Sequence, residues 1–398
     1  MKIYKVGGAV RDELLGLEPT DNDWVVVGST PKEMLSMGYK QVGKDFPVFL
    51  HPDTKEEYAL ARKEKSTGPG HQAFKFSFDP NVTIEEDLLR RDITINAIAK
   101  DMTDGSFIDP YNGRDDIKNK VLRHVSSSFK EDPLRIFRVG RFYTKFNKEF
   151  EIDSGLEEII IQMFPDIIHL SGERIWAETE KALNYEKPYI YFYCLLDLAK
   201  NNKFFVENYL KKYLSIDPVV LNWRYAYDYQ VQTHVHDANR FSTVKPHGKW
   251  YEINPGVNSP EAWWSIMSSL VSDIDSLNAR LNVPKKYRKM SQLTNTFRNK
   301  YFKEFKNLST EEKVNTLFEC MEMIQPSKNI DYAVNVGFIA ANDILGSNDI
   351  HKLKDFIIEY SAITPSEDEK KLSSIEIIDI LNKRKLKLIE QEINKAKG

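Results

Sequence analysis

The sequence has few cysteines, no long apolar run and no strong excess of either charge. Its two cysteines, Cys194 and Cys320, are far apart in apolar surroundings and lack the spacing of metal ligands, so we expect two reduced core thiols. No apolar run approaches the ~20 residues that cross a bilayer, and the chain starts on a strand-like segment instead of a signal peptide. We therefore expect a cytoplasmic protein that is neither a disulfide scaffold nor membrane-bound.

The net charge of −3 excludes a chain that is basic over its whole surface. A local basic groove stays compatible with it, because nucleic-acid binding depends on where Lys and Arg cluster. With 398 residues, the chain is long enough for two or more domains that each bury a core.

Strand and helix signals alternate over the first part of the chain and then give way to helical periodicity. Asp23–Val27 is a short apolar strand, whereas Arg62–Val82 has little periodicity and predicts a long loop. The pattern turns helical after Thr83, and almost no strand signal follows Glu131. The predicted fold class is α+β: a small mixed β-sheet head in 1–125, a helical neck in 126–200, and a helical body and tail in 201–398.

Two acidic residues stand at the start of that strand. Asp21 and Asp23 are two apart, so on an extended chain both carboxylates project to the same side. Such a pair repels itself unless a cation lies between, and Mg²⁺ prefers carboxylates completed by substrate phosphate oxygens. Alone, the pair indicates a solvated acidic turn. It follows the Gly7-Gly8 turn and Arg11, which suit a phosphate, and the combination favours a metal site.

Three arginines recur further along the chain beside an apolar stripe. Arg135, Arg138 and Arg141 come at every third position and share one face of a predicted helix, with few acidic partners nearby. A solvated helix face is one interpretation. We favour recognition of a phosphate or a base, for which the guanidinium is suited.

Five motifs follow one another along the chain: Gly7-Gly8-Ala9-Val10-Arg11-Asp12, Asp21-Asn22-Asp23, Arg90-Arg91-Asp92-Ile93-Thr94-Ile95-Asn96-Ala97, Asp109-Pro110-Tyr111-Asn112-Gly113 and Glu131-Asp132-Pro133-Leu134-Arg135. Their order and spacing resemble those of the class II tRNA nucleotidyltransferases, the CCA-adding enzymes. The resemblance is dense over about the first 145 residues, and Ser171–Glu178 is similar to the family's next motif, which braces the neck. It implies a polymerase β-like head and template-independent addition of C, C and A to the 3′ end of tRNA from CTP and ATP, with release of pyrophosphate.

The resemblance also implies a role for each motif residue. Asp21 and Asp23 would hold the catalytic Mg²⁺ ions, and Gly8 and Arg11 would contact the triphosphate. Arg91 and Asp92 would recognise the ribose. Asp132 and Arg135 would present a hydrogen-bonding edge to the base, and Arg138 and Arg141 would complete the base and phosphate pocket. In the same way, Asp109–Gly113 would serve as a hinge, and the loop over 62–82 would help switch specificity from CTP to ATP.

The second half departs from the family pattern. Members of this branch often carry an HD phosphohydrolase domain, but the comparable stretch at 223–228 has Tyr227 where a histidine would stand. The His236-Asp237 pair, with His234 and His247 nearby, we interpret as polar loop residues, so we expect a degenerate HD region without phosphohydrolase activity. Basic and aromatic stretches at 285–289, 297–303 and 383–385 are candidate tRNA contacts, although each alone favours a solvated helix face.

Three alternatives stay open at this point. A poly(A) polymerase has a similar head, and a partial CC-adding or A-adding enzyme would share the motifs, although the 62–82 loop favours full CCA addition. A non-catalytic tRNA-binding module is disfavoured by the intact Asp21, Asp23, Asp132 and Arg135. The predicted partners are a tRNA 3′ end, CTP and ATP, with no membrane; the oligomeric state stays open.

Overall fold

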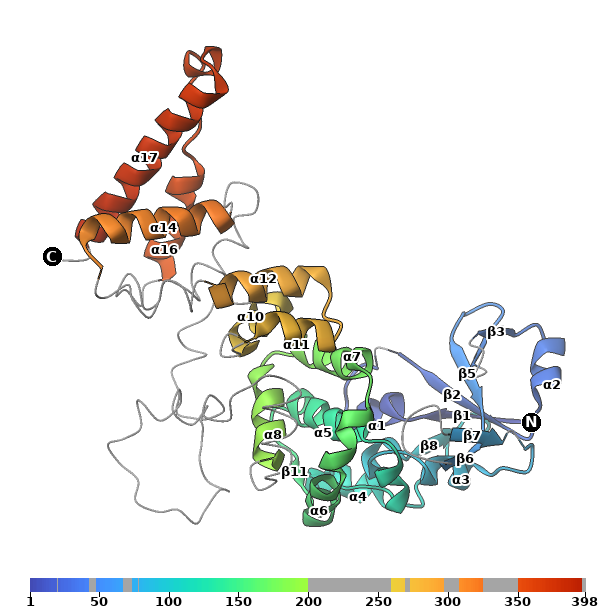
Figure 1. The fold of residues 1–398 in the computed structure, drawn as a ribbon. Helices are drawn as coiled ribbons and strands as arrows, with labels where there is room; N and C mark the ends of the chain where they lie inside the picture. The colour runs from blue at the N-terminus through green and yellow to red at the C-terminus, as the bar shows by residue number, and fades with distance from the viewer. Residues whose placement is uncertain are drawn as a thin grey trace, which may run out of the picture. The chain divides into compact units, whose positions relative to one another are not determined.

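The computed structural model describes residues 1–19, 21–42, 48–66, 74–77, 79–199, 259–268, 273–296, 308–324 and 350–395 (Figure 1). The chain divides into two compact units, Met1–Tyr209 and Leu210–Gly398. All residues to which the motifs assign a catalytic or nucleotide-binding role lie in the first unit. None of the helices in the described part of the chain is long and apolar enough to cross a membrane.

A mixed seven-stranded sheet forms the head of the first unit (Figure 1). Its strands are β1 (Lys2–Val6), β2 (Asp23–Val27), β3 (Lys40–Val42), β4 (Val48–Leu50), β5 (Glu57–Leu60), β8 (Ala99–Asp101) and β9 (Phe107–Ile108), in the spatial order β3-β4-β5-β2-β1-β8-β9. Only the β2–β5 pair is parallel among these neighbours. The register places Val6 opposite Asp23, so the end of β1 lies beside the start of β2.

Alternating side chains of the central strands supply a core on each face of this sheet. Tyr4, Val6 and Val25 pack on one face, where α3 (Ile84–Leu89) adds Ile84 and Leu88. Val26 packs on the other face with Met34 of α2 (Pro31–Ser36) and with Phe49 of β4. Because successive side chains of a strand point to opposite faces, the sheet carries a layer of buried apolar side chains on each face.

The short helices of the head begin at recognisable caps. Thr30 accepts a hydrogen bond from the backbone of Glu33 at the start of α2, whose first residue is Pro31, as the Thr30-Pro31 pair predicts. Thr83 and Glu86 form the same capping box at α3. The other head helices are α1 (Gly8–Leu14), which follows β1 directly, and α4 (Gly113–Asn119).

Helices dominate the remaining described residues of both units. The first unit continues with α5 (Leu134–Lys145), α6 (Ser154–Met163), α7 (Gly172–Leu183) and α8 (Tyr189–Ala199), and α5 packs against both α7 and α8. In the second unit the described helices include α10 (Pro260–Ser268), α11 (Ile274–Arg280), α12 (Lys285–Thr296), α14 (Thr310–Ile324), α16 (Ile350–Ser361) and α17 (Ser374–Lys395). The prediction of an α+β head followed by helical regions is confirmed.

Two details of the sequence prediction are wrong. Within the expected loop over 62–82, β6 (Lys63–Ser66) and β7 (Phe74–Ser77) pair as an antiparallel ladder. After Thr83 the chain does not stay helical, because β8 and β9 add to the edge of the main sheet beside β1. After Glu131 the described residues hold one short strand, β11 (Glu151–Ile152), which pairs with β10 (Val121–Leu122), in agreement with the near absence of strand signal there. Strands of two to four residues have too few positions to show a period, and it is their pairing with distant segments that defines them.

Candidate active site

The turn at Gly7 lies at the point where three of the motifs meet. Gly7 has φ +69° and ψ −132°, a combination that disfavours any residue with a side chain. A Cβ placed there would lie 2.9 Å from Nη1 of Arg91 and 3.6 Å from Oδ2 of Asp23. The glycine therefore allows a guanidinium and a carboxylate, from segments far apart in the sequence, to approach the same stretch of backbone.

The two predicted metal ligands stand at the start of β2. Asp21 and Asp23 are both exposed, whereas Asn22 between them donates from Nδ2 to Oε1 of Glu56 at 2.9 Å. Within the described residues neither side-chain carboxylate has a hydrogen-bond or ion-pair partner. Two unpartnered carboxylates are a donor set that suits a hard divalent cation. No group of three or more metal-ligating side chains occurs in the described part of the chain, so water and phosphate oxygens would complete the coordination.

Arg11 is buried beneath the glycine turn. Its Nε and Nη2 donate to Oδ1 of Asp12, and its Nη1 donates to Oδ1 of Asn96 at 2.6 Å. The guanidinium also lies 5.3 Å from the ring centre of Phe142 and 5.5 Å from that of Phe146. Arg11 is thus bound on several sides by the protein itself, which fixes the position of its guanidinium.

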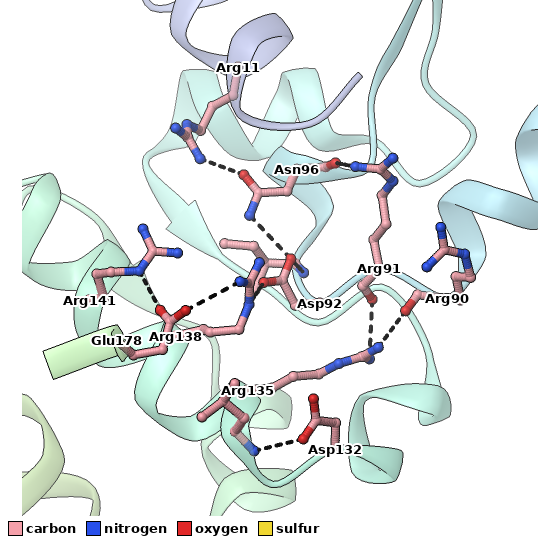
Figure 2. Close-up of polar contacts among 12 residues, drawn as sticks. Arg11, Arg90, Arg91, Asp92, Asn96, Asp132, Arg135, Arg138, Arg141 and Glu178 are labelled. Carbon is pink, nitrogen blue, oxygen red and sulfur yellow. Dashed lines mark hydrogen bonds and ion pairs between the residues drawn. The ribbon is translucent and has the colours of Figure 1, made fainter. Parts of the chain in front are cut away.

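Asp92 lies at the centre of a chain of polar contacts (Figure 2). Its Oδ1 accepts from Nδ2 of Asn96 at 3.1 Å, and its Oδ2 accepts from Nε of Arg138 at 2.7 Å. Burial of Asp92 opposes ionisation, but the Arg138 and Arg135 guanidiniums outweigh it and hold the pKa of Asp92 well below its ordinary value. Asp92 is therefore a buried carboxylate that is charged at neutral pH and joined through Asn96 to Arg11.

Glu178 on α7 continues this chain and was not among the site residues predicted from the sequence. It is buried, it accepts from Nε of Arg141, and its Oε1 lies 3.6 Å from Nη1 of Arg138 (Figure 2). The expectation of few acidic partners near these arginines is wrong for Arg138 and Arg141, because Asp92 and Glu178 reach them from distant segments. The resemblance of Ser171–Glu178 to a family motif was the one signal that could have pointed to Glu178.

Asp132, just before α5, and Arg135, in its first turn, lie close together, and the backbone N–H of Arg135 donates to the carbonyl of Asp132 at 3.0 Å (Figure 2). Arg135 donates to the backbone carbonyls of Arg90, Arg91 and Ser128. Asp132 instead accepts from Nη2 of Arg174 at 2.8 Å. The two predicted base-reading residues are therefore positioned by different partners, and Arg174 is a further residue that the sequence-based assignment missed.

The segment Asp109–Gly113 leads directly into α4. Asp109 accepts from the backbone N–H groups of Gly113 and Arg114, at 2.7 and 2.9 Å. A Cβ at Gly113 would lie 2.3 Å from the carbonyl oxygen of Thr94, so only glycine permits this contact. The segment predicted as a hinge is thus packed against the motif that carries Arg91 and Asp92.

The other sequence candidates lie in the second unit. The stretch 223–228, His234, His236-Asp237 and His247 lie outside the described residues, as does 297–303. On α12, Tyr287 is buried, so its ring is not available for stacking on a base. On α17, Lys383, Arg384 and Lys385 each form an ion pair with an acidic side chain. For these last two stretches the structure favours an ordinary helix face.

Family models match two segments of the first unit. Residues 3–123 match the poly A polymerase head domain. Residues 149–199 match a family described as the probable RNA and SrmB-binding site of polymerase A.

Similarity to curated proteins extends further along the chain. The chain is 39% identical over 352 residues to the multifunctional CCA protein of Haemophilus influenzae (strain PittGG), covering 84% of this chain and 83% of that protein. It is 56% identical over 201 residues to the CCA-adding enzyme of Actinobacillus succinogenes, covering 50% of each chain. It is 54% identical over 198 residues to the multifunctional CCA protein of Haemophilus ducreyi, covering 49% of this chain and 48% of that protein. The chain therefore matches about half the length of the Actinobacillus succinogenes and Haemophilus ducreyi proteins.

Solved structures show the same fold at low identity. The Bacillus stearothermophilus CCA-adding enzyme in complex with CTP is 22% identical with a TM-score of 0.62, over 98% of this chain and 88% of that one. A complex of a CCA-adding enzyme with ATP is 20% identical with a TM-score of 0.61, over 99% and 90% of the two chains.

Proposed function

From the fact that this chain belongs to the family of CCA-adding enzymes, we propose that it adds C, C and A to the 3′ end of tRNA from CTP and ATP. The observation that carries the proposal is the meeting of three motifs at Gly7, where Arg91 and Asp23 approach one turn of backbone. A nucleotide bound at this turn would lie beside the carboxylates of β2 and within reach of a guanidinium.

Asp21 and Asp23 are the proposed ligands of divalent metal, which we take to be Mg²⁺. Bound there, the metal would lower the pKa of the RNA 3′-hydroxyl and neutralise charge on the triphosphate. The chain's own contribution is position and electrostatics, as is general in phosphoryl transfer. Arg11 supports the turn from below, and Arg91 presents Nη1 beside Gly7, where a triphosphate or ribose would approach.

Selection of the base is assigned to the start of α5. Asp132 offers a carboxylate acceptor and Arg135 offers guanidinium donors, the two kinds of group that a base edge pairs with. Because Arg135 donates to the carbonyls of Arg90 and Arg91, the base-reading turn is joined directly to the segment that carries the proposed ribose contacts. Arg138 and Arg141 support this arrangement through Asp92 and Glu178.

The test is the addition of nucleotides to a tRNA whose 3′ CCA has been removed. We expect two additions with CTP alone, three with CTP and ATP together, and no incorporation by the Asp23→Asn variant. A long tail made with ATP alone would instead support a poly(A) polymerase. This is the second candidate, because residues 3–123 match the poly A polymerase head domain. Failure of the folded protein to extend tRNA under any of these conditions would refute the proposal.

A further inference from the structure

A carboxylate with no exposed surface lies beneath the segment that carries Arg91. Asp87 on α3 is 0% exposed and accepts from Nε and Nη2 of Arg90 at 3.0 and 2.7 Å. Its other oxygen lies 3.3 Å from Nη2 of Arg91. The backbone N–H of Arg62, the residue directly before β6, also points to it at 3.4 Å. One buried carboxylate thus accepts hydrogen bonds from two segments of the chain, one at Arg62 and one at Arg90 and Arg91.

Arg91 depends on this carboxylate for its orientation. In the described part of the chain, its guanidinium has two hydrogen-bond partners: Asp87, and the carbonyl of Asn96 at 3.4 Å. With Nη2 bound to Asp87, Nη1 is directed to the Gly7 turn. A Cβ added at Gly7 would lie only 2.9 Å from this nitrogen. Loss of the carboxylate would leave a single weak hydrogen bond to direct the side chain.

The backbone of the same segment is bound by a different residue. The carbonyls of Arg90 and Arg91 accept from Arg135, the proposed base-reading residue (Figure 2). Asp87 therefore binds the side chains of these two arginines while Arg135 binds their main chain. This arrangement fixes the side chain of Arg91 relative to α3 and its main chain relative to α5.

Stability alone does not account for a buried acid at this position. A buried ion pair is often no more stabilising than well-packed apolar side chains of similar volume, because both charges lose their hydration. What a carboxylate adds is geometry: it accepts from several donors in fixed directions. Burial opposes ionisation of Asp87, but the charges of Arg90, Arg91 and Arg62 outweigh it and lower its pKa, so the group is charged at neutral pH.

We propose that Asp87 is a positioning residue for nucleotide binding, which aligns Arg91 at the glycine turn and ties it to Arg62 at the foot of β6. The inference rests on the proposed function, in which Arg91 contacts the nucleotide. It predicts that Asp87 affects nucleotide affinity through Arg91, without touching the nucleotide.

The experiment compares Asp87→Asn with the wild-type protein in CTP binding and in CTP incorporation into trimmed tRNA. We expect the Kd and KM for CTP to rise about tenfold, with kcat changed by less than about threefold, since the reacting groups are untouched. Arg90→Gln is the matched control: it removes a partner of the same carboxylate but leaves Arg91 in place. It should alter the melting temperature and leave the KM for CTP close to that of the wild type.

A double-mutant cycle separates positioning from general destabilisation. If Asp87 acts through Arg91, then Asp87→Asn adds little to the rise in KM that Arg91→Gln already causes. Additive effects of the two changes, or an unchanged Kd in a folded Asp87→Asn protein, would overturn the inference. If that variant does not fold, Asp87→Glu serves instead, because it keeps the charge and displaces the carboxylate; a normal Kd for CTP would refute the positioning role.

Failure of the proposed function gives a different result. A wild-type protein that binds CTP but extends no tRNA would refute CCA addition. The CTP-binding arm would still decide the role of Asp87.

Discussion

Replacing Arg138 with methionine tests the chain of contacts around Asp92. The change keeps much of the apolar stem but removes the guanidinium that lies 2.7 Å from Asp92 and 3.6 Å from Glu178. Loss of one partner from a buried ion pair costs about 3–5 kcal/mol. We expect a smaller cost of about 2–3 kcal/mol, because both acids keep other donors and the Arg138 side chain is 33% exposed.

That loss should appear as a lower melting temperature at neutral pH. For a unit of this size, about 2–4 °C are lost per kcal/mol, so we expect a decrease of roughly 4–12 °C. Because the folded-state pKa of Asp92 lies below its ordinary value of 3.8, its contribution to stability is present above that value and is lost as the pH falls through the folded pKa. The difference between the two proteins should therefore be largest at neutral pH and become smaller in acid.

The assay is thermal unfolding of the wild-type and Arg138→Met proteins at pH 7 and at pH 3. Lys181→Met is the control, since it removes an exposed cation from α7 and should change stability by less than about 0.5 kcal/mol. Equal melting temperatures at pH 7 would refute the reasoning. So would a decrease that is the same at both pH values.

Three further changes test other parts of the site. Gly113→Ala would place a methyl group 2.3 Å from the carbonyl oxygen of Thr94, and we expect a loss of several kcal/mol in the free energy of unfolding, measured by urea denaturation. Gly7→Ala is strained by its positive φ at a cost of about 1–3 kcal/mol, and a variant that keeps its stability and its KM for CTP would contradict our account. Arg174→Gln removes the partner of Asp132; we expect the ratio of CTP to ATP incorporation to change more than the melting temperature, and an unchanged ratio would exclude this support role.

The sequence predicts those parts of the fold and site that local patterns determine. The apolar run within Asp23–Val27 and the cap at Thr30 are visible in consecutive residues, and both describe the structure correctly. The short strands β8 and β9 were missed because their stability comes from pairing at the edge of the sheet, which no local period reveals.

The ion pairs that surround Asp92 and Glu178 could not be predicted from local sequence patterns for the same reason. Asp92 and Arg138 are 46 positions apart, so their pairing depends on how α5 lies against the segment that carries Asp92. Arg141 and Glu178 are 37 apart, so their pairing depends on how α5 packs against α7. Asp87 reads in the sequence as one of several acids in the first turn of a short helix. Its burial among three arginines becomes evident only in three dimensions.

The most direct test of the central claim is the mass of a trimmed tRNA after incubation with the protein, Mg²⁺ and all four nucleoside triphosphates. Our account predicts a single product that is longer by two cytidylates and one adenylate, and no product from a folded Asp21→Asn or Asp23→Asn variant. A run of adenylates, a product containing uridylate or guanylate, or full activity in either aspartate variant would contradict it.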